Sequence, residues 1–130
     1  AYHALNFFLK HPDVFRKVIA LSGIYDVRFF TGDYHNDPLV YHNSPSDYIW
    51  NQNDAWFLDQ YRESDIIVCT GLGAWEQDGL PSFYNMKSAF EAKQIPAWFD
   101  VWGEDVTHDW VWWRRQMPYY LGQLYSQNRI

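Results

Sequence analysis

The fold of this chain follows from the stretch Ile66-Ile67-Val68-Cys69, which is followed shortly by Gly73-Ala74-Trp75-Glu76. A second apolar run, Ala97-Trp98-Phe99-Asp100-Val101-Trp102, precedes Gly103-Glu104-Asp105-Val106-Thr107-His108-Asp109-Trp110. Both runs are short and apolar, as strands of a covered sheet are. An acid therefore follows one predicted strand, and a histidine follows the next strand along the chain.

The rest of the chain alternates between strand-like and helix-like segments. A third apolar run, 18–21, ends at Ser22-Gly23 and predicts another strand. Apolar residues spaced for one helical face predict helices near 1–10, 82–93 and 111–125. Because this alternation is typical of βαβ units, we expect strands 18–21, 66–70 and 97–102 to form a mainly parallel sheet. We expect one α/β domain over residues 1–130, since this length fits a single domain.

Local signals predict where individual helices begin and end. Asp54 is expected to cap a helix that runs to Tyr61, and Ser82 is expected to cap the helix before Ile95-Pro96. Ser46 or Asp47 is expected to cap a short helix within 24–53, an otherwise irregular stretch long enough to be a functional lid or binding loop. Pro118 is expected to kink or break the last helix.

Composition excludes several classes of protein. The net charge is −6 and no Lys/Arg cluster is larger than a pair such as Arg114-Arg115, so a nucleic-acid partner is not expected. No apolar run approaches the roughly 18 residues of a membrane span, so no membrane partner is expected. The single cysteine, Cys69, excludes an internal disulfide and is compatible with a reducing compartment, which favours a cytoplasmic location.

The order of the acid and the histidine matches the last two members of a Ser…Asp/Glu…His triad in α/β-hydrolases. The serine of such a triad lies earlier, in a G-x-S-x-G turn between a strand and a helix, and this sequence contains no such turn. The chain opens with helical sequence, as a hydrolase would if it began directly after that turn. Ser22 is the nearest imitation, but it is followed by Gly23 only.

Several segments together carry a resemblance to a known family: Ala1-Tyr2-His3-Ala4, His11-Pro12-Asp13-Val14-Phe15, Leu21-Ser22-Gly23-Ile24-Tyr25-Asp26, Gly71-Leu72-Gly73-Ala74-Trp75-Glu76, and the segment from Val101 to Trp113 with its His-Asp-Trp-x-Trp-Trp motif. On these, the chain resembles the "putative esterase" (esterase D-like) family of α/β-hydrolases. The resemblance covers essentially the whole chain and implies the C-terminal half of a three-layer α/β-hydrolase fold.

The same resemblance implies the roles of individual residues. His108 would be the catalytic base, and Glu76 the acid that orients it, with Asp78 as the alternative acid. The family mostly uses Asp as its acid, so Glu76 is a departure. The serine nucleophile would lie upstream of Ala1, with the last glycine of its turn immediately before Ala1; it is not in this chain.

The histidines also allow a metal hypothesis. His35 and His42, with Asp33 and Asp37, have the side-chain types that bind zinc, but the spacing matches no known zinc motif. Histidine and aspartate in loops are usually solvated, and we therefore expect neither a metal ion nor an organic cofactor.

Three functions remain open at this point. The leading hypothesis is a serine ester hydrolase of small-molecule esters, represented here by its acid and histidine half and not competent alone. The alternatives are a non-catalytic binding or scaffold protein that retains the hydrolase core, and a carbohydrate-binding module, which the parallel-strand pattern disfavours. Since an unpaired strand edge invites association, we expect strand 18–21 to be covered by a second copy or by the N-terminal part of the molecule.

Overall fold

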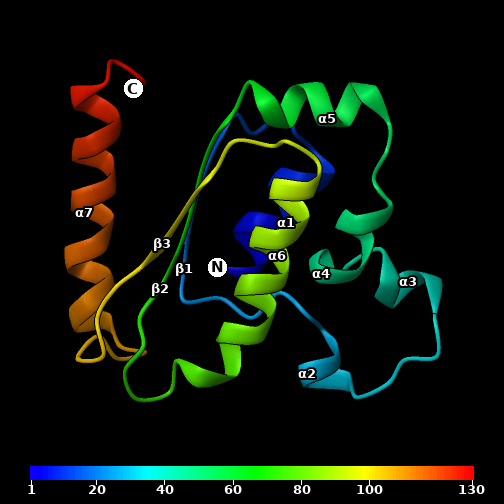
Figure 1. Ribbon diagram of the computed structural model, residues 1–130, viewed down its shortest axis with the longest axis horizontal. Helices are drawn as coiled ribbons and strands as arrows, with labels where there is room; N and C mark the ends of the chain where they lie inside the picture. The colour runs from blue at the N-terminus through cyan, green and yellow to red at the C-terminus, as the bar shows by residue number, and fades with distance from the viewer.

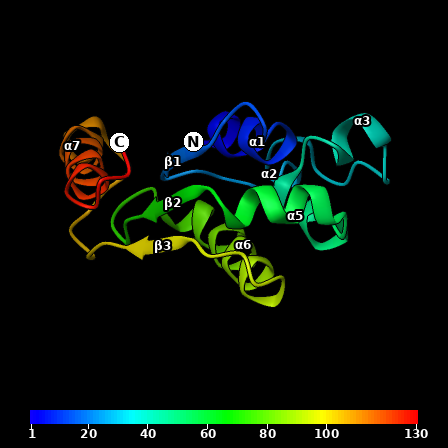
Figure 2. The same ribbon diagram turned by 90° about the horizontal axis from the view of Figure 1, so that it is seen from above.

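The computed structural model describes residues 1–130 and has a parallel sheet between two layers of helices (Figure 1, Figure 2). The three strands are β1 (Lys17–Leu21), β2 (Asp65–Thr70) and β3 (Trp98–Val101), in the spatial order β1-β2-β3. The helices are α1 (Tyr2–Lys10), α2 (Arg28–Thr31), α3 (Pro38–Tyr41), α4 (Pro45–Tyr48), α5 (Ala55–Arg62), α6 (Leu80–Ala92) and α7 (Trp110–Ser126), with 3₁₀ turns η1 (Ile49–Asn51) and η2 (Gln77–Gly79). The predicted fold class, strands and main helices are confirmed.

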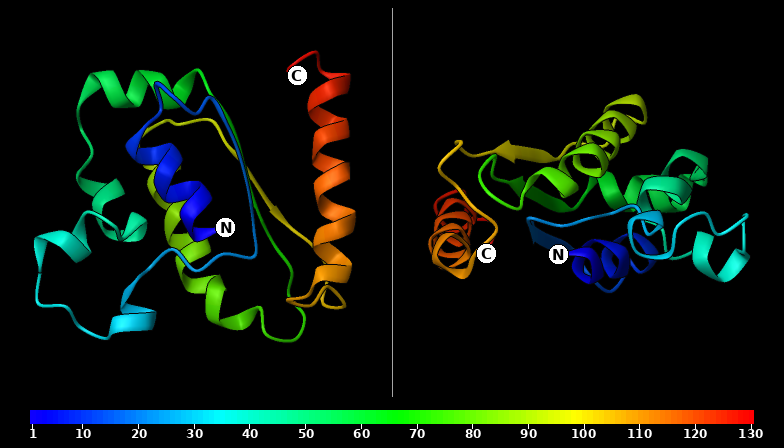
Figure 3. Two further views of the ribbon diagram at one scale, coloured as in Figure 1. Left: turned by 180° about the vertical axis from the view of Figure 1, so that it is seen from behind. Right: turned by 90° about the horizontal axis from the view of Figure 1, so that it is seen from below.

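Alternate residues of the strands build the two cores. Val18, Ala20, Ile66 and Val68 pack in a cluster with the apolar faces of α1 and α6. Their neighbours Ile67 and Cys69 pack with Tyr120 and Leu124 of α7, with Ile19 and Leu21 at the margin. Because successive side chains of a strand point to opposite faces, strands that are apolar throughout need helices on both sides. Figure 3 shows the result, with α7 alone on one face.

The segment 24–53 is more ordered than its composition predicts, because it contains the short helices α2, α3 and α4 and the turn η1. The Arg28 guanidinium contacts the Asp26 carboxylate at 3.0 Å and the Asp47 carboxylate at 2.7 Å, and thereby joins α2 to α4. The prediction that Ser46 or Asp47 caps a helix is wrong: α4 begins at Pro45, behind Ser44. Proline suits this first helical position because its fixed φ is already helical.

Of the other two predicted caps, one is confirmed. The Asp54 side chain accepts a hydrogen bond from the Trp56 backbone N–H at the start of α5. Ser82, by contrast, lies inside the first turn of α6, which begins at Leu80 behind Gly79. The Ser82 hydroxyl instead accepts a hydrogen bond from the Tyr25 backbone N–H at 2.9 Å. The Ser82 side chain therefore makes a tertiary contact with a distant segment and does not cap the helix as predicted.

Pro118 is expected from the sequence to kink or break the last helix. It does not break it, since α7 runs continuously from Trp110 to Ser126; a kink at Pro118 stays a prediction. Pro118 is exposed and has no N–H to donate to the carbonyl of the preceding turn. Pro118→Ala should therefore raise the free energy of unfolding by about 1–3 kcal/mol, measured by urea denaturation. Pro38→Ala is the matched control: Pro38 stands at the first position of a helix, so no gain is expected there. An unchanged or lower stability of Pro118→Ala would contradict this account.

Strand β1 pairs with β2 only, so its outer edge has no strand partner within this chain. Ile19 and Leu21 lie beside this edge and line a hollow together with Trp113 and Met117 of α7. What covers the edge stays a prediction. The structure contains no helix with the length and apolar character needed to cross a membrane.

Burial makes the single cysteine unreactive. The Cys69 side chain is fully buried in β2, and desolvation raises the pKa of its thiol to about 12. The carboxylates of Asp100 and Glu76 raise this pKa further, whereas a hydrogen bond with Tyr120 lowers it. Cys69 therefore belongs to the core rather than to a chemical site.

Candidate active site

The loops that follow β2 and β3 lie side by side at the carboxyl edge of the sheet (Figure 1, Figure 3). Three backbone hydrogen bonds join them. The Leu72 N–H donates to the Gly103 carbonyl at 3.1 Å, the Gly73 N–H donates to the Val106 carbonyl at 2.8 Å, and the His108 N–H donates to the Ala74 carbonyl at 3.0 Å. The approach requires glycine, because a Cβ on Gly73 would lie 2.7 Å from the Val106 carbonyl oxygen. The glycines thus bring the segment that carries Glu76 against the segment that carries His108.

Glu76 and His108 face one another at this edge. The Glu76 side chain is only 2% exposed, and its Oε1 atom lies 3.8 Å from Nδ1 of His108. That separation is too long for a hydrogen bond but close enough for an ion pair with a protonated imidazole. The two residues are therefore brought together more loosely than the hydrogen bond of a complete triad requires.

The His108 ring has one protected side and one open side. Its side chain is 40% exposed, while the ring packs edge-to-face against Trp113, with 4.8 Å between the ring centroids. Trp113 comes from α7, which begins at Trp110. The imidazole is therefore held by α7 and faces both a buried carboxylate and solvent.

Asp78, the alternative acid, lies in η2 and is exposed. It makes no ion pair with His108 in the structure, although both residues line the same hollow of about 310 Å³. Ile24, Phe29 and Trp75 form the apolar walls of that hollow. Asp78 therefore stands at its rim and not behind the imidazole.

A second, larger hollow of about 560 Å³ also borders His108. Ala1 and Tyr2, at the N-terminal end of α1, line it together with Phe30 of α2 and Trp110 of α7. The N-terminus of α1 is directed toward the carboxyl edge of the sheet, and no side chain caps it. The loops after β2 and β3 and the start of α1 thus converge on one region.

Sequence reasoning missed two contributors to this region. Ser22 directly follows β1, and its hydroxyl donates a hydrogen bond to Glu76 Oε1 at 2.7 Å. The indole N–H of Trp113 donates to the same Ser22 oxygen at 3.1 Å. The sequence could have indicated Ser22 by its position, because Ser22 follows a predicted strand just as Glu76 and His108 follow the other two.

The four residues of the metal hypothesis do not form a site. His35 Nδ1 lies 3.5 Å from an oxygen of Asp33, but both side chains are largely exposed. Nowhere in the structure do three or more His, Cys, Asp or Glu side chains gather in a way that could hold a metal ion.

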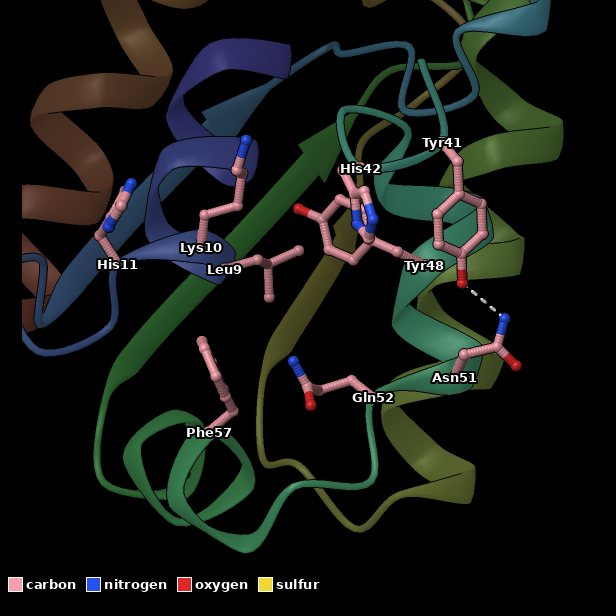
Figure 4. Close-up of a pocket in the computed structure, with 9 residues that line it drawn as sticks. All are labelled: Leu9, Lys10, His11, Tyr41, His42, Tyr48, Asn51, Gln52 and Phe57. Atoms are coloured by element: carbon pink, nitrogen blue, oxygen red, sulfur yellow. Dashed lines mark hydrogen bonds between the residues drawn. The ribbon is translucent and has the colours of Figure 1, made fainter. Parts of the chain in front are cut away.

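A separate cavity of about 350 Å³ lies between the end of α1, the α3–α4 region and α5 (Figure 4). Leu9, Tyr48 and Phe57 line it, with polar groups around them. Several of these groups are already paired: Asn51 donates to the Tyr41 hydroxyl at 2.6 Å, as Figure 4 shows, and the Lys10 ammonium donates to Asn43 at 3.1 Å. This cavity is lined by other residues than the two hollows that His108 borders.

Comparison with known proteins bears on the family and the fold. The family model described as "Putative esterase" matches residues 1–124. Among solved structures, a ferulic acid esterase superposes with a TM-score of 0.64 at 20% sequence identity, covering 86% of this chain and 42% of that protein. No curated protein matches the sequence. The chain spans less than half of the length of the ferulic acid esterase. At this sequence identity, the structural match establishes the fold alone. Since the family model covers nearly the whole sequence, this chain belongs to the putative esterase family.

Proposed function

We propose that this chain supplies the base and the acid of a serine carboxylic ester hydrolase that acts on small-molecule esters. His108 takes the proton of a serine hydroxyl and later returns it to the leaving alcohol. Glu76 accepts a hydrogen bond from the Nδ1–H of His108, which fixes the tautomer and stabilises the imidazolium. The serine stands in a turn immediately before α1, as the family resemblance implies.

The observation that carries this proposal is the convergence of three distant segments on His108. A buried carboxylate lies 3.8 Å from the imidazole, and the uncapped start of α1 borders a hollow that His108 also lines. A serine placed at that start would face the open side of the ring. Packing alone gives no reason for an acid, a base and a free helix N-terminus to meet.

The start of α1 also suits the oxyanion of an acyl-transfer reaction. The free N–H groups and the positive end of the helix dipole favour negative charge at this point. Stabilisation of the oxyanion often lowers the barrier of acyl transfer more than any other single effect. The 3.8 Å between Glu76 and His108 would shorten as the imidazole becomes charged, since catalytic hydrogen bonds commonly tighten in the complex.

A labelling experiment on the longer protein that carries this chain tests the proposal. A fluorophosphonate should modify one serine, located by peptide mass spectrometry in the turn before α1, and His108→Ala should slow that labelling at least 100-fold. His35→Ala is the matched control, because His35 is a largely exposed loop histidine that lines neither hollow beside His108. Modification of Ser22, or of no serine at all, would contradict the proposal and favour a binding or scaffold role.

A further inference from the structure

Ser22 adopts a backbone conformation that serine seldom takes. Its φ angle is +56°, in the left-handed region, and the residue is only 7% exposed. A non-glycine residue in this region costs about 1 kcal/mol or more and persists where the surroundings impose it. Its backbone N–H donates to the Cys69 carbonyl at 2.8 Å, which ties Ser22 to the end of β2.

The Ser22 hydroxyl acts both as a hydrogen-bond donor and as an acceptor. Its single proton goes to Glu76 Oε1 at 2.7 Å, and its oxygen accepts the indole N–H of Trp113 at 3.1 Å. This hydroxyl makes no hydrogen bond with His108. The geometry therefore differs from that of a nucleophile, whose proton must face the base.

Two hydroxyls lie within hydrogen-bond distance of Glu76, those of Ser22 and Thr70, and only the Ser22 hydroxyl has no other acceptor for its proton. The Thr70 hydroxyl lies 3.2 Å from Glu76 Oε2 but 2.9 Å from the Gly71 carbonyl oxygen. Since a hydroxyl has one proton, Thr70 cannot donate to both acceptors at once. The Ser22 proton has no competing acceptor.

Ser22, Glu76, His108 and Trp113 form a closed ring of contacts that includes the acid and the base. Ser22 binds the Glu76 oxygen that faces His108, and Trp113 contacts both the Ser22 hydroxyl and the His108 imidazole. A displacement of Ser22 would therefore move the carboxylate and loosen the indole that supports the imidazole. The two hydrogen bonds of Ser22 join residues that lie 54 and 91 positions apart in the sequence.

We infer that Ser22 is a positioning residue: its hydroxyl, held by Trp113, fixes the Glu76 carboxylate with Oε1 directed at His108. This inference rests on the proposed function, because it assigns a role to the acid of that site. Ser22 acts through Glu76 and touches neither the substrate nor the serine nucleophile.

The test uses Ser22→Gly in the longer protein that carries this chain, since glycine accepts the left-handed backbone and removes only the hydroxymethyl group. We expect kcat for an activated ester to fall about 10- to 100-fold, as for loss of a hydrogen bond to a charged group, with KM within about threefold. Gln94→Gly is the matched control, because Gln94 has a φ of +57° and is exposed in the turn after α6, outside the site; it should leave kcat unchanged.

A second variant removes the other half of the contact. Trp113→Phe keeps a ring beside His108 but loses the N–H that Ser22 accepts, so a smaller fall in kcat, about two- to fivefold, is expected. The double variant should be no slower than Ser22→Gly alone, because the two residues act through one hydroxyl. The proton NMR signal of the His108 Nδ1–H, identified by its loss in His108→Ala, should move upfield in Ser22→Gly, which a merely structural role would not cause.

Wild-type kcat with an unmoved proton signal in Ser22→Gly would overturn the inference, as would fully additive losses in the double variant. These results separate it from the proposed function. If His108→Ala retains turnover, the proposed function fails; if that variant is inactive while Ser22→Gly is unimpaired, only the positioning role fails.

Discussion

Replacing His108 with alanine should lower kcat for an activated ester by about 10⁶-fold in the longer protein that carries this chain, because loss of a triad base leaves only binding and oxyanion stabilisation. Glu76→Gln should lower kcat by roughly 10⁴-fold, since the base remains but its tautomer and imidazolium lose their partner. The measurement is steady-state hydrolysis of an activated ester, with circular dichroism to show that each variant is folded.

Asp78→Asn is the matched control for the acid. Asp78 lines the same hollow but makes no ion pair with His108, so kcat should stay within about threefold of wild type. If Asp78→Asn is the inactive variant and Glu76→Gln is active, the acid is wrongly assigned although the mechanism survives. Turnover that persists in His108→Ala would remove the mechanism itself.

Gly71→Ala should destabilise the protein by about 3 kcal/mol, because a Cβ at this position would overlap both the carbonyl oxygen and the side chain of Val106. Backbone cannot give way as a flexible side chain can, so the loop that carries His108 must move. Since a displacement of about 1 Å can cost 100-fold in rate, kcat should fall by roughly that factor even where the variant is folded.

Chemical denaturation and kinetics on the same preparation check this prediction. Gly122→Ala provides the contrast, because nothing lies within 4 Å of a Cβ at this position in α7. That change should stabilise the protein by about 0.5–1 kcal/mol, as alanine favours helix. If Gly71→Ala is as stable and active as wild type, the close approach of the two loops is not needed to place His108.

The sheet was predictable from the sequence because each strand is a short apolar run and each main helix has one apolar face. The observed order β1-β2-β3 fits the tendency of consecutive strands to lie next to one another. Such local patterns do not predict which side chains make contacts with distant segments. Ser82 has the chemistry of a cap, but the Tyr25 N–H claims its hydroxyl, and α6 begins at Leu80 instead. Pro118 is tolerated within α7, where it is exposed and the packing of neighbouring residues holds the helix.

The candidate site was predictable in part for a similar reason. Strand ends that carry chemistry meet at the carboxyl edge of a parallel sheet, so His108 and Glu76 could be expected near one another. The buried Glu76 carboxylate accepts a hydrogen bond from Ser22, which is 54 positions away, and no local pattern predicts that contact. In the sequence, Trp113 is likewise one of several aromatic residues on α7, and only the structure shows that its indole N–H donates a hydrogen bond to Ser22.

A crystal structure of the longer protein with a phosphonate bound covalently to its serine tests the proposed triad most directly. The modified serine oxygen should lie near Nε2 of His108, within about 3.2 Å, while Nδ1 faces Glu76. The phosphonate oxygen, which stands in for the oxyanion, should be directed at the start of α1. A modified serine remote from His108, or a His108 ring that has turned away from Glu76, would contradict the proposed triad.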